Sequence, residues 1–330
     1  MSRGLIFITG ATGFIGSATA VEALKAGYKV RLCLRKPSEQ LQSVLSEYSN
    51  QVEYVIVPDL TSETAFNGKL NDVDYIFHLA SPLVHGTNKE TYFTPAVKAT
   101  TYLLKAAAKI PSIKKVVVTS SVAALMPMTG VPAGGVIKED NDWDFSVDEN
   151  GSFENPENPA ATPMRLYQAS KLLANKATWD FRATTKPHFA LVTLHPVFVW
   201  GHNPMQTSAE EVAAGSNGLL WSLIMQNNGA ASRGVHIQDV AEAHVKVLDP
   251  KIPDGSKYLL AGPSETGPAI TSIVKRLYPD SGAKITEDIQ LASSPLDTTK
   301  AERELGIKWR SYETMITDVM DQQLGFYHKL

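Results

Sequence analysis

Apolar stretches of strand length recur along the first two-thirds of the chain, separated by segments whose apolar residues repeat at helical spacing. The runs Tyr75-Ile76-Phe77 and Val116-Val117-Val118 are continuous, a pattern typical of strands buried on both faces of a parallel sheet. The predicted strands are residues 5–9, 28–34, 51–57, 73–79, 113–121 and 188–194. The predicted helices are residues 13–25, 37–49, 90–109, 163–184, 216–226, 239–248, 268–278 and 311–327.

This alternation predicts an α/β fold, a doubly wound parallel sheet of the Rossmann type. After about Pro196 the alternation becomes less regular, and Pro and Gly interrupt the segments. We therefore expect a first domain over residues 1–195, completed by a strand and a helix from about residues 230–262. Residues 196–330 are expected to form a smaller C-terminal lobe that is interleaved with it.

Composition narrows the class of protein. With 330 residues, of which 43% are hydrophobic and 20% charged, the chain can bury a sizeable core. Its net charge of −3 offers no basic surface for nucleic acid or an anionic membrane. Cys33 is the only cysteine, so no disulfide can form within the chain, which is typical of a reducing compartment. Since no segment reaches the roughly 18–20 apolar residues of a membrane-spanning helix, we expect a cytoplasmic protein.

The first predicted strand leads directly into a glycine turn, Gly10-Ala11-Thr12-Gly13-Phe14-Ile15-Gly16, and then into a helix. Glycines let backbone N–H groups approach a diphosphate, and the positive end of the helix dipole faces its charge. A glycine turn after a strand can also be no more than a turn. Its place between a strand and a helix favours a dinucleotide site with Gly10, Thr12, Gly13, Phe14, Ile15 and Gly16 as contacts.

The second predicted strand ends in Arg35-Lys36, and no acidic residue follows until Glu39. Enzymes that bind the ribose hydroxyls of NAD place an acid here, whereas the 2′-phosphate of NADP requires a cation. Arginine can form two parallel hydrogen bonds with a phosphate. We therefore predict NADP(H), although a solvated arginine after a strand is the simpler alternative.

Tyr167 and Lys171 lie four residues apart in a predicted helix and so share one face. A phenol is ordinarily too weak an acid for proton exchange at neutral pH, and a nearby cation stabilises its phenolate. Thr119-Ser120-Ser121 ends the fifth predicted strand, at the edge where such sheets bind ligands. A solvated helix face and a capping serine are the alternatives. The combination predicts carbonyl chemistry, with Ser121, Tyr167 and Lys171 as catalytic residues.

Residues 127–162 are rich in Pro, Gly, Asn and acidic residues and separate Ser121 from Tyr167. A loop of this length is uncommon unless it is functional. We expect a substrate-facing flap in which Trp143 docks, whereas residues 148–159 are dispensable. An idle surface loop anchored by Trp143 is the alternative.

Taken together, these motifs resemble the extended short-chain dehydrogenase/reductases, in particular the dihydroflavonol, cinnamoyl-CoA and fungal aldehyde/ketone reductases. The resemblance spans nearly the whole chain. It also includes Asp59-Leu60, His78-Leu79-Ala80-Ser81-Pro82, His195-Pro196-Val197-Phe198-Val199-Trp200-Gly201, His236-Ile237-Gln238-Asp239-Val240-Ala241 and Leu296-Asp297-Thr298-Thr299-Lys300-Ala301.

The resemblance implies an NADP-dependent oxidoreductase that reduces the carbonyl of an aldehyde or ketone. Ser121 would polarise the carbonyl, Tyr167 would donate the proton, and Lys171 would assist Tyr167 and bind the nicotinamide ribose. The remaining implied cofactor contacts are Asp59, Leu60, Leu79, Ala80, Ser81, Thr119, Pro196, Val197, Val199 and Ser216. His236 and Asp239 are interpreted as a structural helix entry.

Two other functions remain open on this fold: a nucleotide-sugar epimerase or dehydratase, and a non-catalytic regulatory protein that senses the cofactor. Residues 216–226, which include Leu219-Leu220-Trp221 and Met225, contain no arginine for a sugar-nucleotide diphosphate. The family often has an asparagine in the helix after the fourth strand, but residues 95–100 contain none. The expected partner is a small carbonyl substrate, with no metal, nucleic acid or membrane, for a monomer or homodimer.

Overall fold

A seven-stranded parallel sheet forms the centre of the computed structural model, which describes residues 3–229 and 232–327. The strand order is β3-β2-β1-β4-β5-β6-β9, so the order reverses between β1 and β4 and opens a crevice at the carboxyl ends of these strands. The strands are β1 (Leu5–Thr9), β2 (Lys29–Leu34), β3 (Val52–Ile56), β4 (Tyr75–His78), β5 (Lys115–Thr119), β6 (Ala190–Pro196) and β9 (Lys257–Leu260). The predicted fold class is confirmed.

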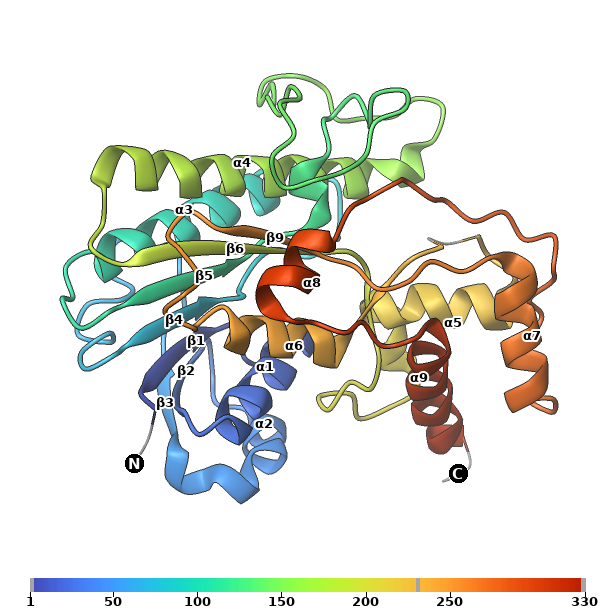
Figure 1. Cartoon of the computed structure of the whole chain (residues 1–330), viewed down its shortest axis with the longest axis horizontal. Helices are drawn as coiled ribbons and strands as arrows, with labels where there is room; N and C mark the ends of the chain where they lie inside the picture. Colours follow the sequence, from blue (N-terminus) through green and yellow to red (C-terminus); the bar gives the residue numbers. More distant parts are fainter. Residues whose placement is uncertain (1–2, 230–231, 328–330) are drawn as a thin grey trace.

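Helices cover both faces of this sheet (Figure 1). On one face α3 packs against α4, and on the other α1 packs against α6, with α2 beside it. Because each face is covered, β1 and β5 consist almost entirely of buried residues. These helices are α1 (Phe14–Lys25), α2 (Glu39–Val44), α3 (Glu90–Ala107), α4 (Thr162–Thr185) and α6 (Ile237–Lys246).

The C-terminal lobe has its own apolar cluster, which includes Trp200, Leu223, Ile270 and Met315. Its elements are β7 (Val199–Trp200), α5 (Ser216–Gln226), β8 (Val235–His236), α7 (Gly267–Leu277), α8 (Thr299–Leu305) and α9 (Tyr312–Tyr327). Strands β7 and β8 pair as a separate two-stranded sheet. Residues from this half of the chain, α6 and β9, complete the central α/β layers, while the domain boundaries themselves remain a prediction.

Several elements differ from the sequence-based expectation. The predicted helix over 37–49 is α2 followed by a 3-10 helix, Ser46–Gln51, because Val44, Ser46, Tyr48 and Asn50 are weak helix formers. The fifth strand ends at Thr119, two residues earlier than predicted, and Ser121 instead caps the 3-10 helix η2 (Val122–Leu125). Strand β7 and helix α8 are additional to the predicted elements, whereas β8 and β9 lie within residues 230–262, where a strand is expected without exact bounds.

No helix in the described ranges is long and apolar enough to cross a membrane. Within the same ranges, no group of three or more His, Cys, Asp or Glu side chains is placed to hold a metal ion.

Candidate active site

The turn after β1 is shaped by glycines at two close contacts. Gly10 has φ +75°, and a Cβ there would lie 2.7 Å from the backbone nitrogen of Ala80. A Cβ on Gly16 would lie 2.1 Å from the carbonyl oxygen of Gly10. Helix α1 begins at Phe14, with no side-chain cap from Gly13 and no acidic residue in its first turn. The first N–H groups of the helix and its positive dipole end therefore remain available, and this cradle fits a dinucleotide diphosphate.

Two cations follow β2 beside this turn. In the parallel register Thr9 pairs with Cys33, which places Arg35 and Lys36 just beyond the glycine turn on the neighbouring strand. Both side chains are exposed, and neither makes an ion pair or hydrogen bond with another described residue. They are free to contact a phosphate on the adenosine ribose.

The carboxylate of Asp59 already has a local function. Its Oδ1 accepts hydrogen bonds from the backbone nitrogen of Thr61 at 2.8 Å and from the Thr61 hydroxyl at 2.7 Å. These hydrogen bonds lower the pKa of Asp59. Asp59 thus stabilises its own turn, and Leu60 packs against the core. Contacts of either residue with adenine remain a prediction.

The end of β4 is fixed by a chain of buried hydrogen bonds. The hydroxyl of Thr9 accepts from the Ala80 N–H at 3.2 Å and donates to Nδ1 of His78 at 2.8 Å. Nε2 of His78 donates to the hydroxyl of Thr100 at 3.1 Å, which in turn donates to the carbonyl of Ala96. In this arrangement Nδ1 of His78 accepts a proton and only Nε2 carries one, so the ring is neutral. Burial of His78 lowers its pKa to about 3. Leu79, Ala80 and Ser81 follow on this fixed strand end.

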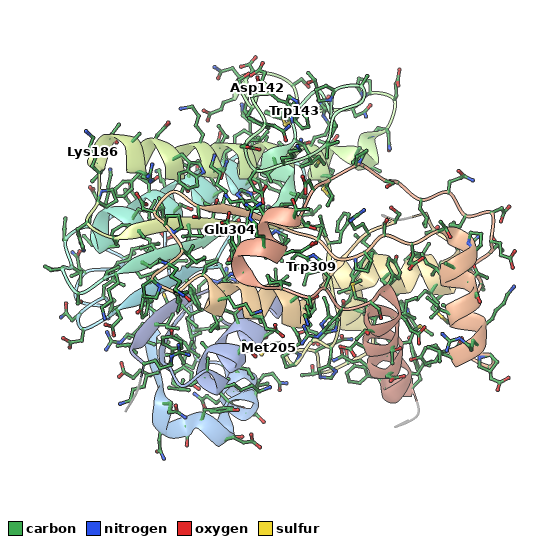
Figure 2. The ribbon with its side chains drawn as sticks, viewed as in Figure 1. Asp142, Trp143, Lys186, Met205, Glu304 and Trp309 are labelled. Atoms are coloured by element: carbon green, nitrogen blue, oxygen red, sulfur yellow. The ribbon has the colours of Figure 1, made fainter. Side chains whose placement is uncertain are left out.

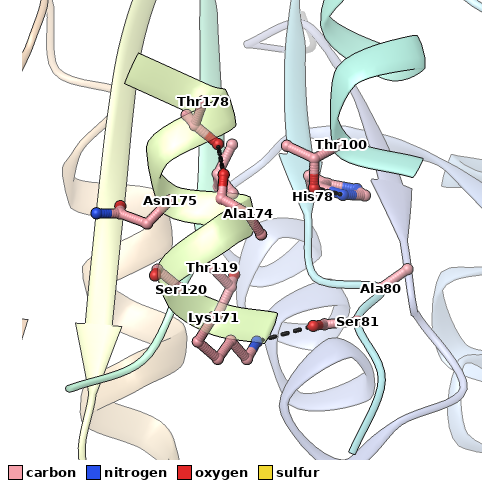
Figure 3. Close-up of a pocket in the computed structure, with 11 residues that line it drawn as sticks. His78, Ala80, Ser81, Thr100, Thr119, Ser120, Lys171, Ala174, Asn175 and Thr178 are labelled. Atoms are coloured by element: carbon pink, nitrogen blue, oxygen red, sulfur yellow. Dashed lines mark hydrogen bonds between the residues drawn. The ribbon is translucent and has the colours of Figure 1, made fainter. Parts of the chain in front are cut away.

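Helix α4 carries the predicted pair, and the structure brings it to the strand ends. Nζ of Lys171 donates to the hydroxyl of Ser81 at 2.9 Å, as Figure 3 shows. The same Nζ lies 5.5 Å from the centre of the Tyr167 ring. Lys171 is buried, and no acidic side chain in the described ranges forms an ion pair with it. The described part of the chain therefore leaves this positive charge without a counter-ion beside the Tyr167 ring.

Ser121 lies where β5 passes into η2, and η2 packs against α4. Its Oγ accepts a hydrogen bond from the backbone nitrogen of Ala123 at 3.2 Å, which leaves the hydroxyl proton free to donate. Its carbonyl accepts from Nδ1 of His195 at 3.1 Å. The side-chain amide of Gln168, the residue after Tyr167, donates to the carbonyls of Met126 and Pro127. The serine segment and the tyrosine helix are thereby held together.

A small cavity of about 20 Å³ lies between Lys171 and the ends of β4 and β5 (Figure 3). This volume is enough for about one water molecule. Its polar lining comes from His78, Ser81, Thr100, Thr119, Ser120, Lys171, Asn175 and Thr178.

The remaining predicted contacts lie at the ends of β5 and β6 or follow them in the chain. The hydroxyl of Thr119 donates to Nε2 of His244 at 2.7 Å, so its side chain is already paired with α6. Pro196 ends β6, and the backbone nitrogen of Val197 bonds to Leu260 of β9. The Ser216 hydroxyl at the start of α5 donates to the carbonyl of Val199, so these two residues are neighbours, and their contacts with a cofactor remain a prediction.

The segment expected as a flap, residues 127–162, ends in the 3-10 helix η3 (Pro159–Ala161) and the first residue of α4. Its part up to residue 158, called the flap below, covers the amino-terminal half of α4 (Figure 1). It is fully described and forms no helix or strand apart from a bridge between Ile137 and Leu296. Figure 2 shows Trp143 above that half of α4, while Lys186 marks the opposite end of the helix. Trp143 packs in a cluster with Ile137 and Leu259. Phe153 is buried, with its ring 5.3 Å from that of Phe93, so the expectation that residues 148–159 are dispensable is not supported.

Sequence reasoning did not identify Gln168, Thr100, His244 or Tyr92 as parts of this site. Thr100, His244 and Tyr92 lie outside the motifs, and like Gln168 they have partners that are distant in the chain or in no motif, as with Thr119 and His244. The one local signal is the position of Gln168 next to Tyr167.

Comparisons with known proteins agree with this geometry. The sequence model of the NAD dependent epimerase/dehydratase family matches residues 6–261. The chain is 60% identical to ketoreductase sphI of Aspergillus fumigatus, an alignment that covers 99% of each protein. It is 28% identical to the putative NADPH-dependent methylglyoxal reductase GRP2 of Candida albicans, with 98% of this chain and 99% of that protein covered. The solved structure of Gre2 from Candida albicans in complex with NADPH is similar, with a TM-score of 0.81, 26% identity and coverage of 98% and 100%.

Proposed function

The chain belongs to the NAD dependent epimerase/dehydratase family, and we propose that it is an NADPH-dependent reductase of aldehydes or ketones. The expectation of an oxidoreductase that acts on carbonyl groups is confirmed by the ketoreductase relative, which matches almost the whole chain. The observation that carries the proposal is the position of Lys171, bound to Ser81 and close to the ring of Tyr167.

The cofactor, when bound, supplies a hydride to the carbonyl carbon. The negative charge then develops on the carbonyl oxygen, and this oxygen needs donors aimed at it. The free hydroxyl proton of Ser121 donates a hydrogen bond to the oxygen, and the Tyr167 hydroxyl transfers its proton to form the alcohol. Lys171 stabilises the phenolate that remains. The reverse sequence oxidises an alcohol, with Tyr167 as the base.

Arg35 and Lys36 support NADPH as the cofactor. They are unpaired cations at the strand end where the 2′-phosphate of NADP would lie, and β2 ends without an acid. In contrast, α5 of the substrate lobe contains neither Lys nor Arg, which disfavours a sugar-nucleotide diphosphate as substrate.

The direct test is steady-state oxidation of NADPH with a panel of aldehydes and ketones. Tyr167→Phe should lower kcat by a factor of about 100 or more, since general acid catalysis commonly supplies that much. NADPH binding, followed by its fluorescence, should be retained. Tyr102→Phe, on α3 and away from the crevice, is the matched control and should behave as the wild type. Turnover of the wild type but equal turnover of Tyr167→Phe would contradict the assignment of the acid.

The other two residues should give different kinetic signatures. Lys171→Ala should lower both kcat and NADPH affinity, because Lys171 serves the phenolate and the ribose. Ser121→Ala should lower kcat with little change in NADPH affinity. An epimerase, a dehydratase or a regulatory protein would bind the cofactor without stoichiometric oxidation of added NADPH.

A further inference from the structure

Three large apolar side chains are exposed in the two segments that carry Ser81 and Tyr167. Leu83 is 66% exposed and Val84 46%, both in the segment that follows β4. Met164, near the start of α4, is 41% exposed. Large apolar residues are ordinarily buried, so a group of them at the surface often marks a binding site.

These side chains adjoin the catalytic pair through the chain itself. Ser81, two residues before Leu83, accepts the hydrogen bond of Lys171 at 2.9 Å. Met164 precedes Tyr167 by three residues on α4, so the two lie on neighbouring turns of the same helix side. Exposed apolar side chains therefore lie two residues from Ser81, the hydrogen-bond partner of Lys171, and three residues from Tyr167.

The segment after Ser81 is held rigidly rather than left as a free loop. The hydroxyl of the fully buried Tyr92 accepts the N–H of His85 at 2.7 Å and lies within hydrogen-bonding distance of the carbonyls of His85 and Gly86. The ring of His85 stacks on that of Tyr92, with centres 4.0 Å apart. Tyr92 itself packs in one cluster with Leu166 and Tyr167. Leu83 and Val84 are thus fixed in an exposed position, which lowers the entropic cost of binding.

The charge around this surface disfavours anions. Lys89 donates to the carbonyl of Glu149 at 2.8 Å, and the ring contact between Phe93 and Phe153 lies nearby, so the flap rests against the start of α3 beside Tyr92. No Lys or Arg occurs between Glu139 and Arg165. The same stretch carries the acids Glu139, Asp140, Asp142, Asp144, Asp148, Glu149, Glu154 and Glu157. The negative charge of the flap therefore disfavours a substrate with a carboxylate or phosphate.

We propose that Leu83, Val84 and Met164 form an apolar lip that binds the hydrocarbon part of the substrate. The substrate class is then an uncharged carbonyl compound with an extended apolar chain, rather than a small hydrophilic or anionic one. This inference rests on the proposed reductase function.

The test measures kcat/KM with NADPH for unbranched methyl ketones from butanone to nonanone. Burial of each added methylene should raise kcat/KM by about two- to fourfold until the lip is covered. Leu83→Ser and Met164→Ser should flatten this dependence and leave the KM for NADPH unchanged. Leu277→Ser is the matched control, because Leu277 is 37% exposed on the distant helix α7. If Leu277→Ser flattens the dependence of kcat/KM on chain length as much as Leu83→Ser does, the proposal of the apolar lip is wrong.

A second arm tests the charge. A keto acid should react more slowly than its methyl ester, and the difference should shrink as salt is added, because salt screens exposed charges. Equal rates for the two would overturn the anion exclusion. A wild-type enzyme that reduces all methyl ketones equally well would overturn the lip and leave the reductase function intact. Failure to reduce any carbonyl would overturn both.

Discussion

Lys171 is a buried cation whose charge is not neutralised by an ion pair with another described residue. Burying an ammonium is costly unless it is hydrogen-bonded, and Ser81 supplies that hydrogen bond. The neighbouring His78 adds no second positive charge, because burial and, to a lesser degree, the charge of Lys171 lower its pKa to about 3. The positive charge of Lys171 is therefore held 5.5 Å from the centre of the Tyr167 ring without a neighbouring charge of either sign from these two residues.

Arg35 is the residue on which cofactor choice should depend. Arg35→Ala should lower kcat/KM with NADPH by about 10- to 100-fold, since charge-assisted hydrogen bonds to a phosphate contribute roughly 1.5–3 kcal/mol. The kcat/KM with NADH should change little, because NADH has no 2′-phosphate. Steady-state kinetics with both cofactors and one aldehyde measure the change.

Two further variants sharpen this comparison. Lys36→Ala should show a smaller loss with NADPH if Lys36 supplies the second phosphate contact. Lys25 lies at the end of α1, away from the carboxyl ends of the strands, so Lys25→Ala should leave kcat/KM with NADPH and with NADH unchanged. Equal efficiency with NADH and NADPH in the wild type would show that Arg35 does not select the cofactor.

At the scale of elements, the flap is anchored at several points. Ile137 exchanges backbone hydrogen bonds with Pro295 and Asp297, and Glu139 accepts the N–H of Leu259 at 2.8 Å. The flap therefore connects the C-terminal segment, β9 and, through Phe153, the start of α3. This arrangement supports a shaped wall over the crevice more than a loop that swings freely about its glycines.

Trp143→Ala should consequently affect the substrate side of the crevice. Loss of this ring from its cluster loosens the flap over α4, so KM for bulky carbonyls should rise several-fold while KM for NADPH stays constant. Trp179→Ala, a partly buried tryptophan near the other end of α4, is the matched control. Steady-state kinetics with a small and a bulky aldehyde make the comparison. If the preference between the two is the same in all three proteins, the flap has no role in selecting substrate.

The elements that sequence predicted well are those with a strong local pattern. The buried runs of β1 and β5 and the long amphipathic helices α3 and α4 appear within a few residues of their predicted bounds. Strand β9 has only four residues, and its place beside β6 follows from sheet pairing rather than from its own sequence. Ser121 was predicted as a strand end and is a cap, because local hydroxyl bonding ends the strand at Thr119.

The same distinction holds for the site. Motifs within one segment, such as the glycine turn and the pair Tyr167 and Lys171, were evident from spacing. Contacts between distant segments, such as Thr119 with His244 and Glu139 with Leu259, have no local signature. They depend on how the sheet and the flap fold together, which periodicity does not specify.

At the scale of the whole molecule, polar contacts join the C-terminal lobe to the sheet. His236 caps α6, and its other ring nitrogen lies 2.9 Å from Oδ2 of Asp318 in α9. The buried Asp239 pairs with Arg310, which also contacts Glu242 at 2.7 Å. These contacts support the structural role expected for His236 and Asp239. They join α6, which packs on the central sheet, to α9 and Arg310 of the C-terminal lobe.

His78, His195 and His244 lie buried within these layers, and burial lowers their pKa values to about 3, 3 and 4. Each is held neutral by one donor and one acceptor; in His195, for example, Nδ1 donates to Ser121 and Nε2 accepts from Thr193. In the unfolded chain a histidine has a pKa near 6.5. Below that pH the unfolded state binds protons that the folded state does not, so acidification favours unfolding.

The free energy of unfolding should therefore be highest above about pH 6.5 and fall as pH decreases toward about 4. Each histidine contributes at most about 1.4 kcal/mol per pH unit to the change in the free energy of unfolding, so the three together contribute at most about 4 kcal/mol per pH unit. Glu139 works in the opposite direction, because burial raises its pKa, so the observed slope should be smaller. Urea unfolding at pH about 7.5, 6.5 and 5.5 measures the slope. His244→Asn should reduce it by about a third, whereas the exposed His188→Asn should not. A constant free energy of unfolding across this range would show that these histidines are not neutral in the folded protein.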